Sequence, residues 1–167
     1  MIIKRQLTWK DNVSPTMTAE EYMEQFGAKI ELNYKTYEPK KEILEELAEL
    51  LTSKNESLKI LVLGAEWCPD CNKNVPRMIK IIRNINNVKI EFKILYGIMK
   101  TAPHKKGDSL WHKTRSPPEA VDPKFELRAI PTFYIFDSSG NLLDVIIENP
   151  KNNSTLEEEM LSIIKSS

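Results

Sequence analysis

The hydrophobic positions of this chain fall into segments with helical spacing and segments with extended spacing. Helical spacing predicts an amphipathic helix that begins after Pro39, a second helix whose inner stripe runs from Val75 to Ile85, and a terminal helix at 156–164. Pro76 lies inside the second of these, so we expect a kink or an irregular first turn there.

Four further apolar runs have the length and pattern of strands. Residues 59–64 form a continuous apolar run typical of a strand buried on both faces, and residues 90–96 alternate between apolar and charged. Residues 132–136 and 142–147 flank a polar loop and predict an antiparallel hairpin. Because a helix joins the first two strands, those should be parallel. The order of elements predicts an α/β fold with a central mixed sheet flanked by helices.

Two stretches lie outside this pattern. Residues 1–37 carry little apolar periodicity, but Thr18 and Glu21 form a capping box that predicts a short helix at 19–26, ended by Gly27. We assign 1–37 to an N-terminal extension that packs on a main domain at 38–167. A second capping box, with Ser154 as its cap, opens the terminal helix.

Both cysteines lie in one motif, Trp67-Cys68-Pro69-Asp70-Cys71, between a predicted strand and a predicted helix. Two thiols separated by two residues on the first turn of a helix can close a small disulfide ring. The positive end of the helix dipole favours the thiolate form of the first cysteine, which makes it a nucleophile. Strand, CxxC and helix in this order indicate a redox site.

These residues carry a resemblance to a known family. Residues 65–71 (AEWCPDC) after an apolar strand resemble the active-site segment of the thioredoxin family, and Ile130-Pro131-Thr132 before a later strand resembles its cis-proline loop. The resemblance covers about residues 38–167 and implies a thioredoxin-like fold. It implies that Cys68 attacks, that Cys71 resolves, and that Pro131 is cis and lies against the disulfide.

The same resemblance implies a surface for clients. The backbone of Ile130 would pair with an extended client segment, and Trp67 would form part of the surface that faces it. The implied activity is thiol–disulfide exchange on disulfide-containing protein clients, as part of cell redox homeostasis. It needs no bound cofactor, because electrons come from a separate reductase or a small thiol.

Three features depart from the family pattern. Thioredoxins carry a buried acid six positions before the first cysteine, and Val62 stands there in this chain. Glu66, Asp70 or water are the candidates to replace it and to tune the pKa of the thiols. Asp70 also places a negative charge next to the cysteines, which opposes thiolate formation. The third departure is a long polar, proline-bearing connector at 97–122, and residues 119–128 beyond Pro118 predict one short helical piece.

Composition limits the other functional classes. Lysine plus arginine equals aspartate plus glutamate at 24 each, so no overall charge favours nucleic acid or an anionic membrane. No apolar run approaches membrane-spanning length, and the N-terminus lacks the apolar core of a signal peptide. We therefore expect a cytoplasmic protein that binds neither nucleic acid nor membranes.

Several alternatives remain open at this point. The two cysteines could be purely structural. A metal site would need further ligands, and His104 and His112 are eight residues apart, outside the usual spacing of histidine ligands for zinc. An iron–sulfur cluster bridging two chains is disfavoured by a proline beside the thiols, and a peroxide-reducing enzyme lacks an extra cysteine or an activating arginine near Cys68. The main alternative is a non-catalytic binding module that uses the extension and the 97–122 connector; the absence of the acid at Val62 favours it.

Overall fold

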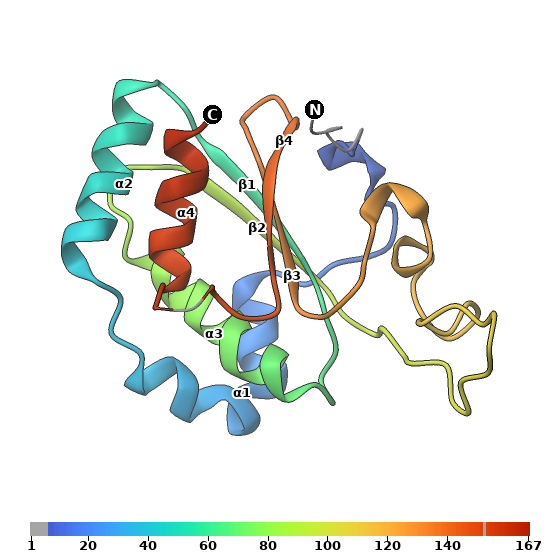
Figure 1. The fold of residues 1–167 in the computed structure, drawn as a ribbon. Coiled ribbons are helices and arrows are strands. Elements are labelled where there is room, and N and C mark those ends of the chain that lie inside the picture. Colours follow the sequence, from blue (N-terminus) through green and yellow to red (C-terminus); the bar gives the residue numbers. More distant parts are fainter. Residues whose placement is uncertain (1–6, 152) are drawn as a thin grey trace.

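The computed structural model describes residues 7–151 and 153–167 of the chain. Its strands are β1 (Leu58–Leu63), β2 (Ile90–Leu95), β3 (Thr132–Phe136) and β4 (Leu142–Ile147). They form a sheet in the order β2-β1-β3-β4 (Figure 1). β1 runs parallel to β2, and β3 is antiparallel to both β1 and β4. The predicted mixed sheet, with its parallel first pair and closing hairpin, is confirmed.

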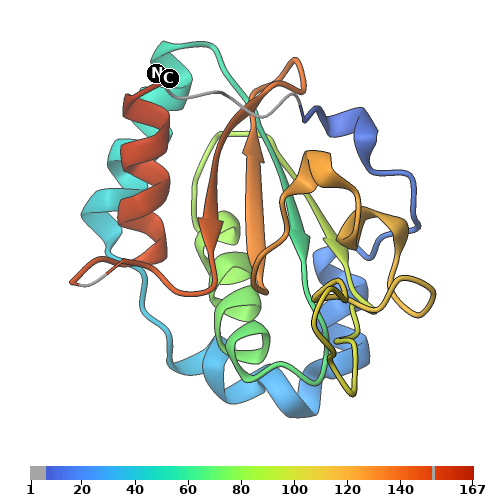
Figure 2. The same cartoon turned by 45° about the vertical axis from the view of Figure 1, so that its right-hand side comes forward.

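The two faces of the sheet are covered differently. Helices α2 (Lys41–Ser53), α3 (Pro69–Arg83) and α4 (Leu156–Lys165) pack together on one side. The N-terminal segment and three short 3-10 turns, η1 (Trp9–Asp11), η2 (Pro118–Ala120) and η3 (Pro123–Phe125), lie on the other side (Figure 2). None of the described helices is both long and apolar enough to cross a membrane.

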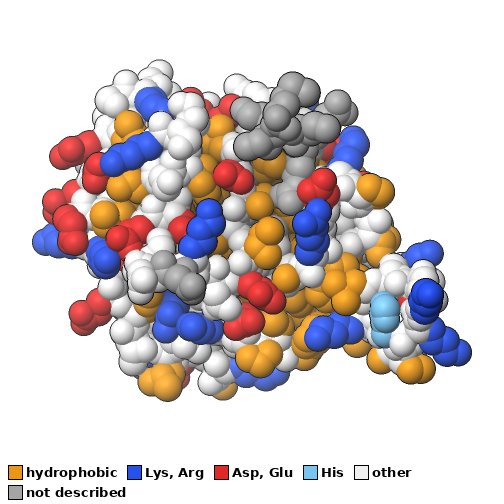
Figure 3. All heavy atoms as spheres, in the orientation of Figure 1, with side chains coloured by type: hydrophobic (Ala, Val, Ile, Leu, Met, Phe, Trp, Pro, Cys, Tyr) orange, Lys and Arg blue, Asp and Glu red, His pale blue; other side chains and the backbone are white. Residues whose placement is uncertain are grey.

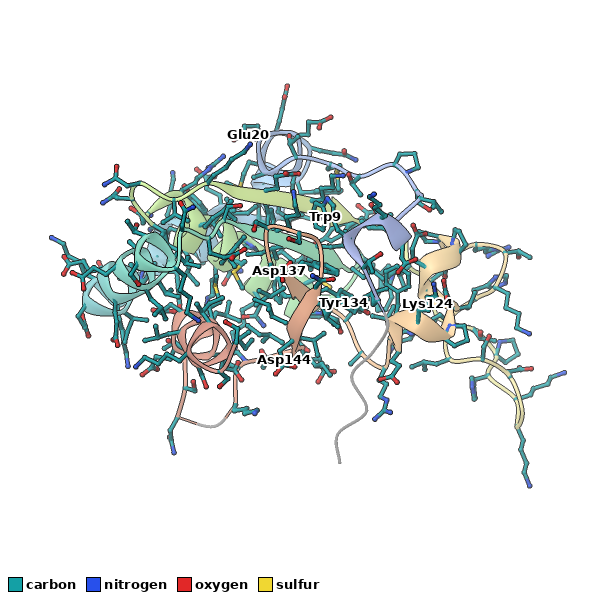
Figure 4. All side chains as sticks on the ribbon, turned by 90° about the horizontal axis from the view of Figure 1, so that it is seen from above. Trp9, Glu20, Lys124, Tyr134, Asp137 and Asp144 are labelled. Atoms are coloured by element: carbon teal, nitrogen blue, oxygen red, sulfur yellow. The ribbon has the colours of Figure 1, made fainter. Side chains whose placement is uncertain are left out.

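Aromatic side chains join η1 and η3 to the sheet. The ring of Trp9 lies 5.4 Å from that of Phe136, and the ring of Phe125 lies 5.7 Å from that of Tyr134, both in edge-on contact. Lys124 on the η3 turn forms an ion pair with Asp11 on η1 at 3.3 Å. Figure 4, seen from above, shows the turn that carries Lys124 beside the one that carries Trp9. The 3-10 turns η1 and η3, rather than α-helices, thus cover this face of the sheet.

Helix α1 (Ala19–Thr36) is twice as long as the capping box alone predicts. Thr18 caps it as expected, accepting a hydrogen bond from the Glu21 amide, but Gly27 does not end it. The helix continues because its buried residues, which include Tyr22 and Ile30, pack between α3 and the edge of β2. That packing exceeds the cost of about 1 kcal/mol for a glycine in a helix interior. The predicted end at residue 26 is therefore wrong.

Helix α3 continues through Pro76. Proline has no amide hydrogen, so the carbonyl of Asn72, four residues earlier, loses its helical partner. The side chain of Asn33 on α1 replaces it, since its Nδ2 donates to that carbonyl at 3.2 Å. A long helix α1 thus supplies the hydrogen bond that Pro76 removes.

Two smaller predictions also change. Thr155, rather than Ser154, caps α4, and its hydroxyl accepts a hydrogen bond from the Glu158 amide at 3.2 Å. Residues 119–128 form no single helical piece; they contain the end of η2 and the whole of η3. Pro118 and Pro123 stand at the first position of η2 and η3, where a missing amide hydrogen is tolerated, and Pro123 favours the extended backbone of Asp122 that separates the two turns.

Candidate active site

Four chain segments meet at one edge of the sheet. Because β1 and β2 are parallel and β3 is antiparallel to β1, Leu63, Leu95 and Thr132 are aligned in the register. The same register pairs Thr132 with Ile147, at the end of β4. The CxxC segment follows β1, the connector follows β2, the Ile130–Pro131 loop precedes β3, and Glu148 follows β4. The topology alone therefore brings the predicted site residues together.

Cys68 is the residue that caps the N-terminus of α3. Its backbone is extended (φ −89°, ψ 118°), and Pro69 occupies the first turn of the helix, where a missing amide hydrogen is harmless. Its side chain is 6% exposed, and its thiol donates to the carbonyl oxygen of Ile130 at 3.6 Å. Cys68 is thus almost closed to solvent, because the 129–131 loop covers its sulfur.

The loop that covers Cys68 is held from both sides. The Ile130–Pro131 peptide bond is cis. The carbonyl of Pro131 accepts a hydrogen bond from the Glu148 amide at 2.7 Å, and the hydroxyl of Thr132 donates to the Ala129 carbonyl at 2.7 Å. The carbonyl of Glu148 in turn accepts from Nδ2 of Asn74 on α3 at 2.8 Å. These bonds tie the segments after β4 and before β3 to the helix that carries the cysteines.

Cys71 lies one turn along α3 and is completely buried. Burial raises the pKa of its thiol well above the ordinary value, and the neighbouring Cys68 and Asp70 raise it further, although a hydrogen bond with the Ala65 backbone acts in the opposite sense. Gly64 makes room for this sulfur: a β-carbon there would lie 2.9 Å from Cys71 Sγ and 2.9 Å from the Tyr96 ring. Both cysteines are free thiols.

The candidates to replace the missing acid differ in position. Val62 is completely buried on β1. Glu66 is exposed and lies 3.6 Å from Lys29 in an ion pair. The negative charge of Asp70 raises the pKa of Cys71, so it does not assist thiolate formation there. Among the hydrogen bonds of the described residues, none joins either carboxylate to a cysteine sulfur.

Two tyrosines that the sequence analysis did not single out lie next to Cys71. The hydroxyl of Tyr96, just after β2, donates to the hydroxyl of Tyr22 on α1 at 3.1 Å, and the two rings are in edge-on contact at 5.3 Å. Burial raises the pKa of both phenols, and the nearby Cys71 raises it further, so both hydroxyls stay protonated. Tyr96 could have been found from topology, since it follows a strand parallel to β1, but Tyr22 could not.

Trp67 forms the exposed border of the site. It is 40% exposed, and its ring nitrogen donates to the Ile98 carbonyl at 2.8 Å. The ammonium of Lys100 lies 5.4 Å from the ring centre, within the range of a cation–π interaction. A hollow of about 360 Å³ opens beside Trp67, and its lining includes Met17, Phe26 and Met99. The N-terminal segment and the connector thus both contribute to the surface around the tryptophan.

The remaining candidates lie apart from the cysteines. His104 is exposed on the connector, and the ring of His112 accepts hydrogen bonds from the backbone of Thr114 and Arg115. Trp111 packs into the domain, with its ring nitrogen donating to the Leu127 carbonyl at 2.8 Å. Within the described ranges, no group of three or more His, Cys, Asp or Glu side chains is arranged to hold a metal ion.

Part of the chain is similar to a known protein family. A family model described as Thioredoxin matches residues 16–96, which span α1, the CxxC segment and β2. The proposed domain boundary at residue 38 stays a prediction. No curated protein matches the sequence. An HIV epitope scaffold is 19% identical, with 96% of this chain and 99% of that chain covered and a TM-score of 0.61.

A second solved structure is similar over the same extent. It is a protein of unknown function from Pseudomonas aeruginosa, 22% identical, with 96% of this chain and 92% of that chain covered and a TM-score of 0.50. At such identities the two likenesses concern the fold alone. The match to the Thioredoxin family model includes both cysteines and the strands β1 and β2, and together with this mixed sheet it supports a thioredoxin-like fold for the chain.

Proposed function

We propose that this chain is a thiol–disulfide oxidoreductase that reduces disulfides in protein clients. The observation that carries the proposal is the position of the Cys68 sulfur, at the N-terminus of α3 and 3.6 Å from the Ile130 carbonyl, with Cys71 one turn behind it. The thioredoxin domain and the two nearby cysteines are compatible with this chemistry.

The reaction uses two thiols and transfers two electrons. The Cys68 thiolate attacks one sulfur of the client disulfide, forms a mixed disulfide and releases the other client sulfur as a thiolate. Cys71 then loses its proton, attacks the Cys68 sulfur and releases the second client thiol. The chain is left with a Cys68–Cys71 disulfide, and a separate reductase or a small thiol returns it to the dithiol. Since this cycle needs a reducing supply, we propose a cytoplasmic location.

We infer that the second step of this reaction, the attack by Cys71, is the slow one. Cys71 is buried and its pKa is raised, and no acid occupies the position of Val62. Few Cys71 thiolates therefore form at neutral pH, so we expect resolution of the mixed disulfide to limit turnover. In this proposal Trp67, Ile130 and Pro131 bind the client, and Asp70 tunes Cys71.

The second candidate is a non-catalytic binding module. The same buried Cys71 and the absent acid favour it, because both oppose fast exchange. In that case the N-terminal extension and the connector would carry the interaction, and the cysteines would only stabilise the site.

Insulin disulfide reduction with dithiothreitol separates the two candidates. The wild type should accelerate it, whereas Cys68→Ser should reduce the rate to that of dithiothreitol alone. After dithiothreitol is removed, reduced Cys71→Ser should accumulate a mixed disulfide with insulin that a reducing gel dissociates. Equal rates for wild type and Cys68→Ser would favour the binding module. A covalent adduct that still forms in Cys68→Ser would show that the nucleophile is assigned to the wrong cysteine.

A further inference from the structure

Most of the connector, residues 97–116, forms an ordered arm. Lys100 and Trp111 face each other in an antiparallel bridge, flanked by backbone hydrogen bonds from Thr101 to Leu110 at 3.0 Å and from His112 to Met99 at 2.7 Å. The buried ring of Trp111 anchors the arm to the Leu127 carbonyl. The arm therefore presents its side chains from a defined base.

The arm is strongly basic in a chain whose formal net charge is zero. It carries five cationic side chains and a single acid, Asp108. All five are exposed, and no described carboxylate lies within ion-pair distance of them: Lys100, Lys105, Lys106, Lys113 and Arg115. The carboxylate of Asp108 accepts a hydrogen bond from the Lys105 amide at 2.9 Å, and this bond closes the turn at the tip of the arm. Figure 3 shows basic side chains, with a histidine among them, on the lobe that projects at the lower right, where Figure 1 places this segment of the chain.

The position of the arm relates this charge to the active site. It leaves the sheet at the end of β2, at the edge where β1 leads into the CxxC segment (Figure 1). At its base, Lys100 lies over the ring of Trp67, next to Cys68 in the chain. Met99 and Leu110 on the arm are 38% and 44% exposed. Exposed apolar and basic side chains of the arm thus begin beside Trp67, the residue before the proposed nucleophile Cys68.

We propose that this arm binds an acidic segment of the client, adjacent to the client cysteine that Cys68 attacks. The inference rests on the proposed function and names its substrate class. Unpaired cations on an ordered support give favourable charge complementarity without first breaking internal ion pairs.

The interaction is electrostatic and exposed, which determines its dependence on salt. At 20 mM ionic strength the five cations act together over the length of a short peptide, whereas at 0.5 M the screening length falls to only a few ångströms. We therefore expect the preference for acidic clients to appear in kcat/KM at low salt and to fade at high salt. It should arise mainly from faster association.

The test compares two peptides with the same disulfide, one flanked by four glutamates and the other by four lysines. Neutral hydroxyethyl disulfide serves as the reference substrate, because it reports the chemistry without docking. We expect the acidic peptide to be reduced about tenfold faster than the basic one at low salt, and less than about twofold faster at 0.5 M salt. The reference rate should be the same under both conditions.

The variant Lys105→Glu/Lys106→Glu changes the tip of the arm. It should abolish or reverse the preference while leaving the hydroxyethyl disulfide rate unchanged. Lys10→Glu/Lys41→Glu is the matched control, with the same change in charge on exposed residues of η1 and α2, and it should keep the preference. Thermal unfolding confirms that both variants are folded.

Each other outcome overturns the inference. Equal reduction of the two peptides, with hydroxyethyl disulfide still reduced, removes the acidic-client inference and leaves the oxidoreductase intact. Failure to reduce hydroxyethyl disulfide removes the proposed function and the inference with it. If the arm instead binds a single-stranded RNA oligonucleotide at 150 mM salt, and neither peptide is preferred, the arm is a nucleic-acid surface rather than a client surface.

Discussion

The hydroxyls of Tyr22 and Tyr96 lie 3.1 Å apart beside the buried Cys71 thiol. Tyr22 comes from α1 and Tyr96 is the residue after β2, so this hydrogen bond joins the N-terminal helix to the sheet beside the candidate site. Phe26 on α1 also contacts both rings, at 5.3 and 5.6 Å. The N-terminal helix is therefore part of the surroundings of Cys71.

The pairing of these tyrosines predicts a non-additive effect on stability. Tyr22→Phe and Tyr96→Phe should each lower the free energy of unfolding by about 1 kcal/mol, because each leaves a buried hydroxyl without its partner. The double variant should lose little more than either single one, since it removes both polar groups. Urea unfolding measures all three. Additive losses would mean that the two hydroxyls act independently.

The raised pKa of Cys71 predicts a loss of stability at alkaline pH. The native state keeps this proton, whereas the unfolded thiol releases it near its ordinary pKa, about 8.5. Its stabilising contribution is therefore present below that pH and is lost as the pH rises toward the folded pKa. The free energy of unfolding of the reduced protein should fall by up to about 1.4 kcal/mol per pH unit above pH 9.

Cys71→Ala is the control for this slope, because it removes the thiol but keeps Cys68. Its stability should fall less steeply between pH 8 and 9.5, a range below that in which unfolded tyrosines titrate. Parallel curves for the two proteins would contradict a raised pKa at Cys71.

The hydrogen bond between Asn33 and the Asn72 carbonyl predicts a dependence on Pro76. Asn33→Ala should lower the free energy of unfolding by about 1 kcal/mol, since it leaves that carbonyl without a partner. In a Pro76→Ala background the new amide hydrogen can bond the same carbonyl, so Asn33→Ala should cost clearly less. Urea unfolding of the wild type, the two single variants and the double variant gives the coupling energy between Asn33 and Pro76. An equal cost of Asn33→Ala in both backgrounds would mean that Asn33 does not compensate for the proline.

Glu119 holds the N-terminal segment against η2. Burial tends to raise the pKa of its carboxyl group, but hydrogen bonds from the Ser14 hydroxyl and from the Val13 and Ser14 amides, at 2.6–2.8 Å, outweigh it and lower the pKa. The ionised group therefore stabilises the fold above the unfolded pKa, and this contribution is lost as the pH falls through the folded pKa.

Glu119→Gln should consequently destabilise the protein by about 1–3 kcal/mol at pH 7 and by less at pH 3. Thermal or urea unfolding across this range provides the measurement, and the exposed Glu24→Gln should show no such difference. A loss that is independent of pH would mean that the carboxylate charge is not what holds the segment.

The connector and the terminal helix show what can be predicted from residues close together in the sequence. Pro103, Pro117 and Pro118 correctly indicate that 97–122 is not regular helix, but they do not reveal the antiparallel bridge between Lys100 and Trp111. The capping box at the start of α4 is off by one residue because Ser154 and Thr155 are equally suitable caps, each followed three residues later by a glutamate. Which of the two residues caps the helix depends on which starting position lets α4 pack better.

The sequence by itself determined the order of elements, the mixed sheet and the motif around Cys68 and Cys71, because periodicity and capping act between residues close in the chain. Only the tertiary structure decided how long α1 is, that Asn33 compensates for Pro76, and that Tyr22 and Tyr96 surround Cys71. These contacts join segments separated by tens of residues, and they form because α1 packs against α3 and β2. No pattern of residues close together in the sequence predicts these contacts.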